Sequence, residues 1–404
     1  MSSLASSSRT GERAGATRGL VAVLLATVVA PLNATMIVVA LPALSADLHT
    51  GAAASSLLVV AYLAPMALLP SLGGRLGDNH GRRAVLLAGL ALFGLASLGA
   101  ASAPSLGLLL ACRVGQAMGG ALAFPNALAL LRELVAERRR GLSFGIVGTA
   151  MALSAAAGPP LGQLLVWYGG WRWVFAVNVP LVAFAVAACS LLPRPARGAD
   201  ASGNGRRGIP RSRSLAAATV AMGLSNLALY AALVGIPLLL SPSRGSETGL
   251  LLMPLLVMAA LVGPVAGRLA DLHGRRAAGV AGLCILAAAL LPIALAGERI
   301  GLQGIAAALA MAGAGLGASS VAIQTGGIEA ADPAGSGAAA GLLATSRYLG
   351  GAAGSGVLPL VLTLAPHASL RALFAVAAAA ALLAAVAGAG LDRRPRPDPN
   401  NSTV

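Results

Sequence analysis

Two arginines interrupt long apolar stretches of the sequence, where a positive charge is costly. Arg113 and Arg347 both lie well inside such stretches. An arginine at the centre of a bilayer costs about 3 kcal/mol or more, so each should face a polar cavity or a partner, with snorkelling to an interface as the alternative. Uncharged polar residues at comparable depth are Asn33, Gln116, Asn126, Asn226, Gln324 and Tyr348. We predict that the two arginines, with Asn33, Gln116, Asn226 and Gln324, line a cavity or take part in coupling to an ion; hydrogen bonding between helices is the alternative role.

A ten-residue motif occurs twice and could form a charged tie between helix ends. Residues 74–83 and 267–276 agree at eight of ten positions, and about half the chain separates them. This repetition predicts two halves related as parallel repeats. The alternative is a basic loop that only fixes topology.

The residue types of the motif suit a conformational latch. Gly73 and Gly77 can share one helix face and let a neighbouring helix approach closely. Asp78 would meet the positive end of a helix dipole, and the arginines that follow can pair with acids or lipid phosphates. The candidate latch residues are Gly73, Gly77, Asp78, Arg82, Arg83, Asp271, Arg275 and Arg276.

Patterns that would indicate an enzyme or a metal site lack the residues they need. Residues 141–145 match the GxSxG motif of serine hydrolases, but that motif follows a strand, and here an arginine-rich loop precedes it. The three cysteines stand singly in apolar segments, and the four histidines form no cluster with metal-ligand spacing. We therefore expect no enzyme activity, no metal and no cofactor.

Composition favours a membrane protein over a soluble one. The 404 residues are 57% hydrophobic and 10% charged, with mean hydropathy +0.83, whereas about a quarter of an average soluble domain is charged. The net charge is +15, and all 28 basic residues are arginines. These arginines are spread over short loops and not gathered on one aromatic-rich surface, so we expect membrane lipid and a small-molecule substrate as partners, and no nucleic acid.

The apolar residues fall into twelve stretches of the length that a helix needs to cross hydrocarbon. The first is longer than the apolar region of a secretory signal, so we expect it to be retained. The predicted helices are 20–44, 55–76, 84–103, 106–131, 141–166, 172–192, 215–240, 249–269, 277–296, 300–327, 335–364 and 369–391. The predicted fold class is an all-α integral membrane protein with twelve transmembrane helices in two parallel-related six-helix halves.

Arginine placement predicts orientation, because short loops rich in arginine stay in the cytoplasm. Of the 28 arginines, 22 lie in the two tails and the even-numbered loops, and four lie in the odd-numbered loops. A multi-pass protein of the cell membrane with both termini cytoplasmic is therefore predicted. The predicted regions are a disordered N-terminal tail (1–18), an N-terminal six-helix half (19–193), a basic cytoplasmic linker (194–213), a C-terminal six-helix half (214–391) and a cytoplasmic C-terminal tail (392–404).

The motif around residues 73–83 resembles the signature of the major facilitator superfamily. The resemblance implies that the motif is a cytoplasmic latch that opens and closes during alternating access. A second resemblance, to drug:proton antiporters, lies in the fifth predicted helix. Its matching residues are Gly145, Gly158, Pro159 and Gly162, while Ser154 and Gln163 replace two glycines usual in that motif. The prolines predict a kink, which would help to close one side of a cavity; a Gly-rich packing helix is the alternative.

Further segments look like the multidrug exporters of the fourteen-helix branch, of the EmrB and QacA type. These segments are residues 31–42, residues 171–175 with Asn178 and Pro180, and residues 347–351. Two departures are evident: about twelve helices are predicted here, and Asn33 stands where that branch commonly has Asp.

The proton carrier is left open by the residues themselves. Arg113 lies in a segment that resembles the family's proton-transfer motif, but arginine does not release its proton usefully. All thirteen acids can be placed in loops, tails or helix ends, so Glu133, Glu329 and Asp332 are the candidates at the cytoplasmic edge. Protons as a coupling partner are implied by the family resemblance alone.

These observations predict a secondary active transporter that exports drugs or amphipathic metabolites by proton-coupled alternating access. An importer or uniporter without proton coupling is the alternative within transport. A non-transporting sensor of the same fold is the alternative outside it. The residues of a broad apolar cavity follow no code from which the substrate can be read.

Overall fold

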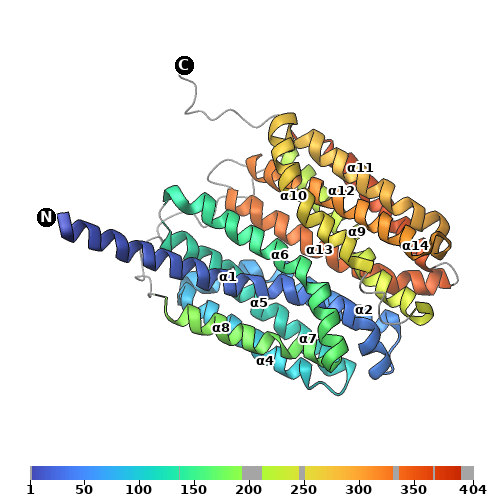
Figure 1. Cartoon of the computed structure of the whole chain (residues 1–404), viewed down its shortest axis with the longest axis horizontal. Helices are drawn as coiled ribbons and strands as arrows, with labels where there is room; N and C mark the ends of the chain where they lie inside the picture. Colours follow the sequence, from blue (N-terminus) through green and yellow to red (C-terminus); the bar gives the residue numbers. More distant parts are fainter. Residues whose placement is uncertain are drawn as a thin grey trace. The chain divides into compact units, whose positions relative to one another are not determined.

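The computed structural model is helical throughout the part of the chain that it describes, which is residues 2–135, 137–192, 212–244, 251–330, 336–366 and 369–392 (Figure 1). The helices of the first half of the chain are α1 (Ser2–Asp47), α2 (Ala52–Leu68), α3 (Pro70–His80), α4 (Arg82–Ala101), α5 (Leu106–Leu134), α6 (Glu137–Gly169), α7 (Arg172–Ala176) and α8 (Asn178–Ser190). Those of the second half are α9 (Arg213–Arg244), α10 (Met253–His273), α11 (Arg275–Ala296), η2 (Gly297–Ile300), α12 (Gly301–Glu329), α13 (Ser336–Leu364) and α14 (Ser369–Gly388).

These helices make twelve membrane crossings, which confirms the predicted fold class. Length and hydropathy alone identify eight segments and one bent pair, α2 with α3, whose axes differ by 50°. One of the eight segments, Arg275–Glu329, contains the two helices α11 and α12. With α6 and α13 added, and with α7 and α8 counted as one crossing, the described helices number twelve crossings.

The first helix begins earlier than the sequence predicts. Residues 1–18 are predicted as a disordered tail, whereas α1 begins at Ser2 and continues to Asp47. The prolines inside α1 are Pro31 and Pro42, so no proline interrupts the helix before residue 20. Once a membrane helix has formed, extending it adds one hydrogen bond per residue without a new nucleation step.

The chain divides into two compact units. Unit 1 comprises Met1–Leu44 and Leu68–Gly203, and unit 2 comprises Ser45–Ala67 and Asn204–Val404. Unit 2 includes the segment that holds α2, so the boundaries of unit 1 are not those of the predicted N-terminal half 19–193. Packing explains the assignment: Leu63 lies next to Gly351 of α13, and Leu63 is fully buried. The predicted linker 194–213 and the predicted C-terminal tail lie almost wholly outside the described residues.

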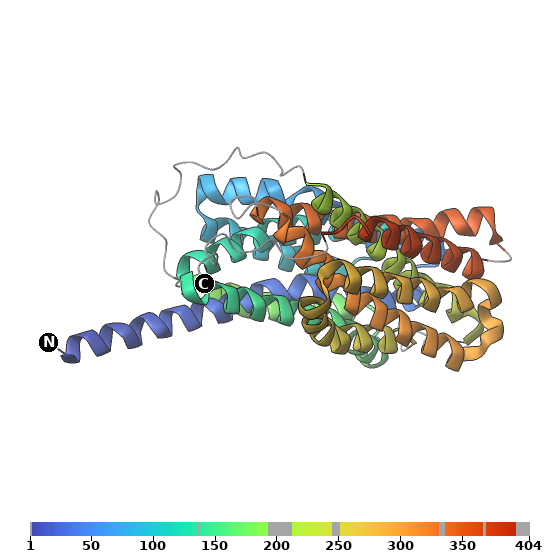
Figure 2. The same cartoon turned by 90° about the horizontal axis from the view of Figure 1, so that it is seen from above.

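Both units use glycines at equivalent places to bring helices together. In unit 1, a Cβ added to Gly89 of α4 would lie 2.7 Å from the carbonyl oxygen of Gly119 in α5. In unit 2, a Cβ added to Gly282 of α11 would lie 2.7 Å from the carbonyl oxygen of Gly315 in α12. The latter two helices run side by side, in gold and orange in Figure 2. Small residues allow the backbones to approach closely, which is how helices pack in a membrane.

Candidate functional site

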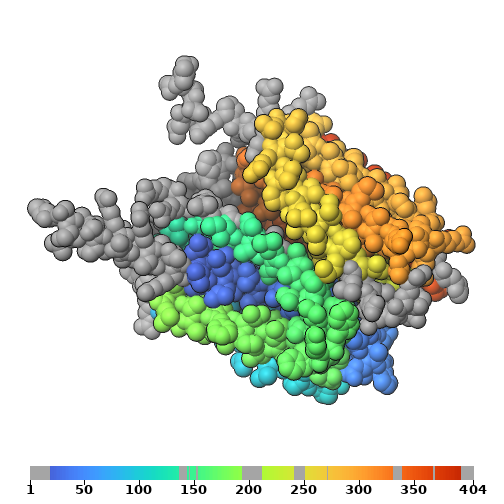
Figure 3. Space-filling model, in the orientation of Figure 1, coloured from blue at the N-terminus to red at the C-terminus, as the bar shows by residue number. Residues whose placement is uncertain are grey.

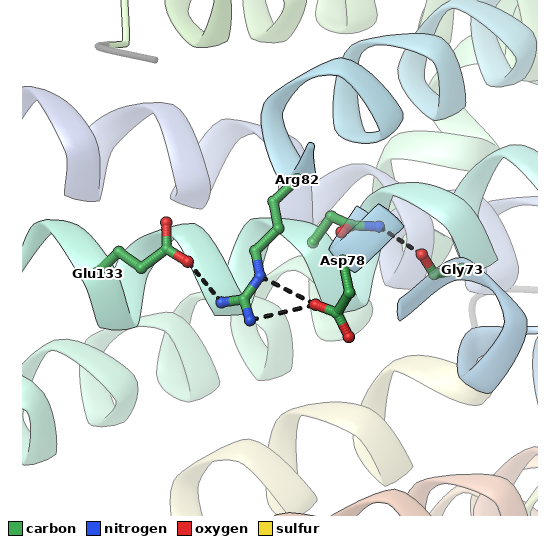
Figure 4. A network of polar contacts seen from close by, with 5 residues as sticks. Gly73, Asp78, Arg82 and Glu133 are labelled. Atoms are coloured by element: carbon green, nitrogen blue, oxygen red, sulfur yellow. Dashed lines mark hydrogen bonds and ion pairs between the residues drawn. The ribbon is translucent and has the colours of Figure 1, made fainter. Parts of the chain in front are cut away.

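The first copy of the repeated motif forms a charged tie that joins three helices of unit 1 (Figure 4). Arg82 is the first residue of α4, after Gly81, whose φ of 95° requires a residue without Cβ. Its guanidinium donates to Asp78 Oδ1 at 3.2 and 3.3 Å, and to Glu133 Oε1 at 2.6 Å. The tie therefore connects the end of α3, the start of α4 and the end of α5.

The two glycines of this motif face α5. A Cβ on Gly73 would overlap the carbonyl oxygen of Ala121, and one on Gly77 would overlap the side chain of Asn126. Asn126 Nδ2 in turn donates to the carbonyl oxygen of Gly73 at 2.9 Å. The glycines thus set the close contact that brings Asp78 within reach of the tie.

Arg83 differs from the prediction that it pairs with an acid or a lipid phosphate. It donates to the main-chain carbonyls of Cys189, at 3.2 Å, and of Ser190. These carbonyls belong to the last turn of α8, where helix carbonyls lack intrahelical partners and a cation interacts favourably with the dipole. Arg83 is therefore a cap for α8 in unit 1.

The second copy of the motif forms a corresponding tie in unit 2. Arg275, the first residue of α11 after Gly274, pairs with Glu329 at the end of α12. The distances are 3.3 Å from Nε to Oε2 and 3.0 Å from Nη2 to Oε1, a two-pronged geometry that orients both groups. Arg276 follows and is half-buried, whereas the side chain of Asp271 and the whole of Asp332 lie outside the described residues.

Arg113 is fully buried in unit 1 and belongs to a polar chain between α4 and α5. Its Nη1 donates to Gln116 Oε1 at 2.9 Å, and Gln116 Nε2 donates to Ser97 Oγ at 2.8 Å. The guanidinium also lies over the ring of Phe175, 5.9 Å from its centroid. The three hydrogen-bonded side chains, Arg113, Gln116 and Ser97, each have 0% exposure. Arg113 is thus stabilised by neutral partners and an aromatic face.

Asn33 forms a buried carboxamide pair with Asn178, across 145 residues of sequence. Asn178 Nδ2 donates to Asn33 Oδ1 at 3.0 Å, and both residues have 0% exposure. Asn33 Nδ2 and Asn178 Oδ1 make no hydrogen bond with the described residues. One donor and one acceptor are therefore available inside the helix bundle of unit 1.

The predicted kink helix, α6, is joined to α1 by hydrogen bonds and glycine contacts. Helix α1 lies between α6 and α8, in blue between the two greens of Figures 1 and 3. Ser154 Oγ donates to the carbonyl of Val28 at 2.6 Å. A Cβ on Gly158 would overlap Thr35 Oγ1, and one on Gly162 would lie 2.7 Å from the carbonyl oxygen of Met36. Ser154, which replaces a glycine of the antiporter motif, thus gains a partner in α1.

The α6 helix continues through the predicted kink. Pro159 and Pro160 lie inside Glu137–Gly169, and their missing amides free the carbonyls of Ala155 and Ala156 from their helical partners. Thr35 Oγ1 donates to Ala155 at 2.9 Å. Gly145 lies in α6, but its surroundings fall outside the described residues.

The remaining polar candidates lie in unit 2. Arg347 Nη2 of α13 donates to Gln324 Oε1 of α12 at 2.7 Å. Asn226 of α9 is buried and donates to the carbonyl of Met222 in its own helix at 2.9 Å. Asn226 therefore serves its own helix, while Arg347 and Gln324 join two helices. In the described part of the chain, no group of three His, Cys, Asp or Glu could hold a metal ion.

Some participating residues are not singled out by spacing. Asn178 and Thr35 fall in segments that carry the family resemblance, but no local signal identifies their partners. Ser97 is a lone serine in an apolar helix. One signal exists for Thr35: two consecutive prolines in a membrane helix free two carbonyls, which need donors from elsewhere.

A comparison with protein families matches residues 23–355 to the Major Facilitator Superfamily. The chain is 39% identical over 176 residues to the uncharacterized MFS-type transporter YvkA of Bacillus subtilis, covering 43% of this chain and 40% of that protein. It is 38% identical over 180 residues to the puromycin resistance protein pur8 of Streptomyces alboniger, covering 44% and 36% respectively. The matches span less than half of these two relatives. Among solved structures, a D-xylose-proton symporter matches with a TM-score of 0.73 at 15% identity, over 92% of this chain and 96% of that one.

Proposed function

The chain belongs to the major facilitator superfamily, and on that premise we propose that it is a secondary exporter of amphipathic small molecules, driven by proton antiport. Transport would proceed by alternating access across the cell membrane, with both chain termini on the cytoplasmic side. The export direction is supported by the similarity to a protein named for puromycin resistance. The substrate itself is a matter for experiment.

The observation that carries the proposal is the pair of equivalent ties. Arg82 with Asp78 and Glu133, and Arg275 with Glu329, hold helix ends at matched places of the two repeats. The Arg82 and Glu133 side chains are 29% and 32% exposed, and a pair of such exposure is worth about 0–1 kcal/mol. A tie of this strength can break and re-form within a transport cycle, whereas a fully buried ion pair would resist breaking.

Helix α6 supports the alternating-access part of the proposal. Two prolines weaken its internal hydrogen bonding, and the glycines that face α1 let it lie against that helix at close range. The same unit holds the buried hydrogen-bonded chain of Arg113, Gln116 and Ser97. This chain would hold polar groups between α4 and α5 in a fixed, water-free arrangement. In this scheme Arg113 orients polar groups and does not carry the proton.

The test is flux in reconstituted vesicles under an imposed pH gradient. Proteoliposomes containing the full chain would be loaded with a panel of amphipathic dyes, and dye movement would be followed with an inward, an outward and no proton gradient. Antiport requires the dye to move against the direction of proton flow. Equal flux under all three conditions would exclude proton antiport while leaving transport itself intact. Empty liposomes and the Arg113→Ala variant, checked for insertion, are the controls.

A uniporter or importer without proton coupling is the second candidate, and Asn33 favours it. The described spans hold Asn33 and Asn178, both uncharged, where a carboxylate could carry a proton, and Glu133 and Glu329 are both engaged in ties. Flux that follows the solute gradient alone, in either direction and at every pH tested, would support this candidate.

A further inference from the structure

Arg347 is the charged residue of unit 2 that lies deepest in a membrane-length helix without a described acid beside it. It is about 16 Å of helix rise from the start of α13 and about 25 Å from its end. If the hydrocarbon layer of about 30 Å is centred on this helix, Arg347 lies about 10 Å inside it. A guanidinium at that depth must face a polar path or a ligand, because facing lipid is too costly.

Arg347 pairs with a neutral side chain, and most of the N–H donors of its guanidinium remain available. The bond from Nη2 to Gln324 Oε1, 2.7 Å long, uses one of five N–H donors. The acid of α12, Glu329, is already held by two nitrogens of Arg275. The positive charge of Arg347 is therefore not balanced by any described carboxylate.

Gln324 is oriented to add donors to the same site. Its oxygen accepts from Arg347, so its Nε2 amide keeps two N–H donors. Its side chain is exposed and that of Arg347 is half-buried, so a ligand can reach both. A planar guanidinium fork and an amide N–H₂ are the groups that bind a carboxylate or a phosphate by several hydrogen bonds.

The surroundings of the pair are closely packed and aromatic. One turn beyond Arg347, Gly351 faces the ring of Tyr230, whose carbons would lie 2.8 and 2.9 Å from an added Cβ. Residues four apart share a helix face, so the buried Tyr230 ring packs against α13 one turn from the guanidinium. One residue back, Ser346 Oγ donates to the carbonyl of Thr219 at 2.5 Å and fixes α13 against α9.

From this arrangement we propose that Arg347 and Gln324 form a binding site for the anionic group, a carboxylate or phosphate, of an amphipathic solute. The inference rests on the proposed function in one respect, that the ligand is the transported solute. Arg347 supplies the charge and Gln324 adds neutral donors, while the apolar body of the solute would extend from this pair toward the hydrocarbon layer. A lipid headgroup presents the same phosphate chemistry, so the experiment distinguishes the two sources.

The experiment measures charge selectivity of binding, independently of flux. Full-length protein in phosphatidylcholine nanodiscs at pH 7 would be titrated with 2-naphthaleneacetate and with the neutral 2-naphthaleneacetamide, which differ only in the anionic group. The carboxylate should bind at least about tenfold more tightly than the amide, as expected for a two-pronged charged contact. Equal affinity of the two probes for the wild-type protein would overturn the proposal, whatever the variants do.

Variants then assign the selectivity to the pair. Arg347→Gln should abolish the preference for the carboxylate, and Gln324→Glu should do the same by supplying an internal partner for Arg347. Arg299→Gln removes the same charge from the exposed η2 turn and should leave the preference unchanged. Selectivity that survives both Arg347→Gln and Gln324→Glu, or that is lost equally in Arg299→Gln, would contradict the assignment.

A lipid arm separates the two sources of anion. The titration is repeated in nanodiscs containing phosphatidylglycerol, and native mass spectrometry counts the lipids retained by the wild type and by Arg347→Gln. Phosphatidylglycerol retained only by the wild type, and not displaced by naphthaleneacetate, would overturn the solute site in favour of a lipid site. Selective binding without vesicle flux would instead contradict the proposed transport and leave this binding site standing.

Discussion

The hydroxyl of Thr35 in α1 donates a hydrogen bond of 2.9 Å to the carbonyl of Ala155 in α6, the carbonyl that Pro159 leaves without its helical partner. Proline at position 159 has no amide to return to residue 155. In a membrane the freed carbonyl needs a donor from another helix, since water is absent. The cost of a proline in the middle of α6 is thus offset by a residue 120 positions earlier in the chain.

Replacing Thr35 by valine should therefore destabilise unit 1. Valine keeps the shape of threonine but lacks the donor, and a buried carbonyl left unsatisfied costs about 1–3 kcal/mol. We expect a lower midpoint of thermal unfolding for Thr35→Val in detergent, followed by intrinsic tryptophan fluorescence. Thr35→Ser keeps the hydroxyl and should unfold nearer to the wild type. Equal midpoints for the valine and serine variants would mean that the hydrogen bond has no net effect.

Replacing Gly158 by alanine should disrupt the contact between α1 and α6, because the added methyl group has no room. An added Cβ would overlap Thr35 Oγ1 and would lie 3.0 Å from the amide nitrogen of Met36, so the two helices must separate. Overpacking of this kind typically costs about 1–3 kcal/mol, and we expect a lower unfolding midpoint together with reduced flux. Gly148→Ala is the matched control, because a Cβ at Gly148 meets no atom within 4 Å. If both alanine variants behave alike, the close contact of α6 with α1 is not needed.

The sequence predicts the crossings well because their signal is local. Hydrocarbon-length apolar stretches need no knowledge of the partner helix, and eleven of the predicted starts lie within a few residues of the observed helices. The exception is α1, since nothing in residues 2–18 marks a helix end. The bend between α2 and α3 is not predicted either; it follows Leu68 and precedes Pro70, within an unbroken apolar stretch.

Partner identity is harder to predict, because it depends on which helix faces are brought together. The sequence marks Glu133 and Glu329 as edge acids, but as candidate proton carriers and not as partners of Arg82 and Arg275. The repeat nevertheless relates the two pairs to each other. In each unit, the acid lies at the end of one helix, and that helix packs against the helix that begins with the arginine. No comparable signal relates Asn33 to Asn178.

The tie in unit 1 should matter more for transport than for folding. Arg82→Gln removes the charge that holds Asp78 and Glu133, but the exposed pairs are worth only about 0–1 kcal/mol each. We expect an unchanged unfolding midpoint within error and a several-fold lower rate of dye flux in proteoliposomes. Raising the salt concentration should slow the wild type toward the variant, since screening weakens exposed ion pairs.

A large loss of folding stability in Arg82→Gln would contradict this interpretation of the tie. Arg75→Gln is the control, because Arg75 lies in the same motif, is exposed and makes no described ion pair. If Arg75→Gln lowers the flux as much as Arg82→Gln, the effect reflects loss of basic charge in the loop and not the tie.

Replacing Asn33 by aspartate should make the stability of the chain depend on pH. Asn33 has 0% exposure, and its Oδ1 accepts from Asn178, so a protonated carboxyl introduced by Asn33→Asp can keep that bond at low pH. As the pH rises, this carboxyl must ionise, and burying its charge is unfavourable. The unfolding midpoint of the variant should therefore fall as the pH rises from about 5 to about 8, while that of the wild type changes less. Dye flux should become pH-dependent over the same interval.

The control for this last change is the same substitution at an exposed position. Asn79 of α3 is exposed, so Asn79→Asp adds an identical carboxyl in contact with water and should leave the pH dependence of the midpoint as it is in the wild type. Burial is the physical difference between the two positions. If the Asn33→Asp profile matches that of Asn79→Asp, the site around Asn33 and Asn178 admits enough water to solvate a charge, and the buried carboxamide pair is not a dry contact between α1 and α8.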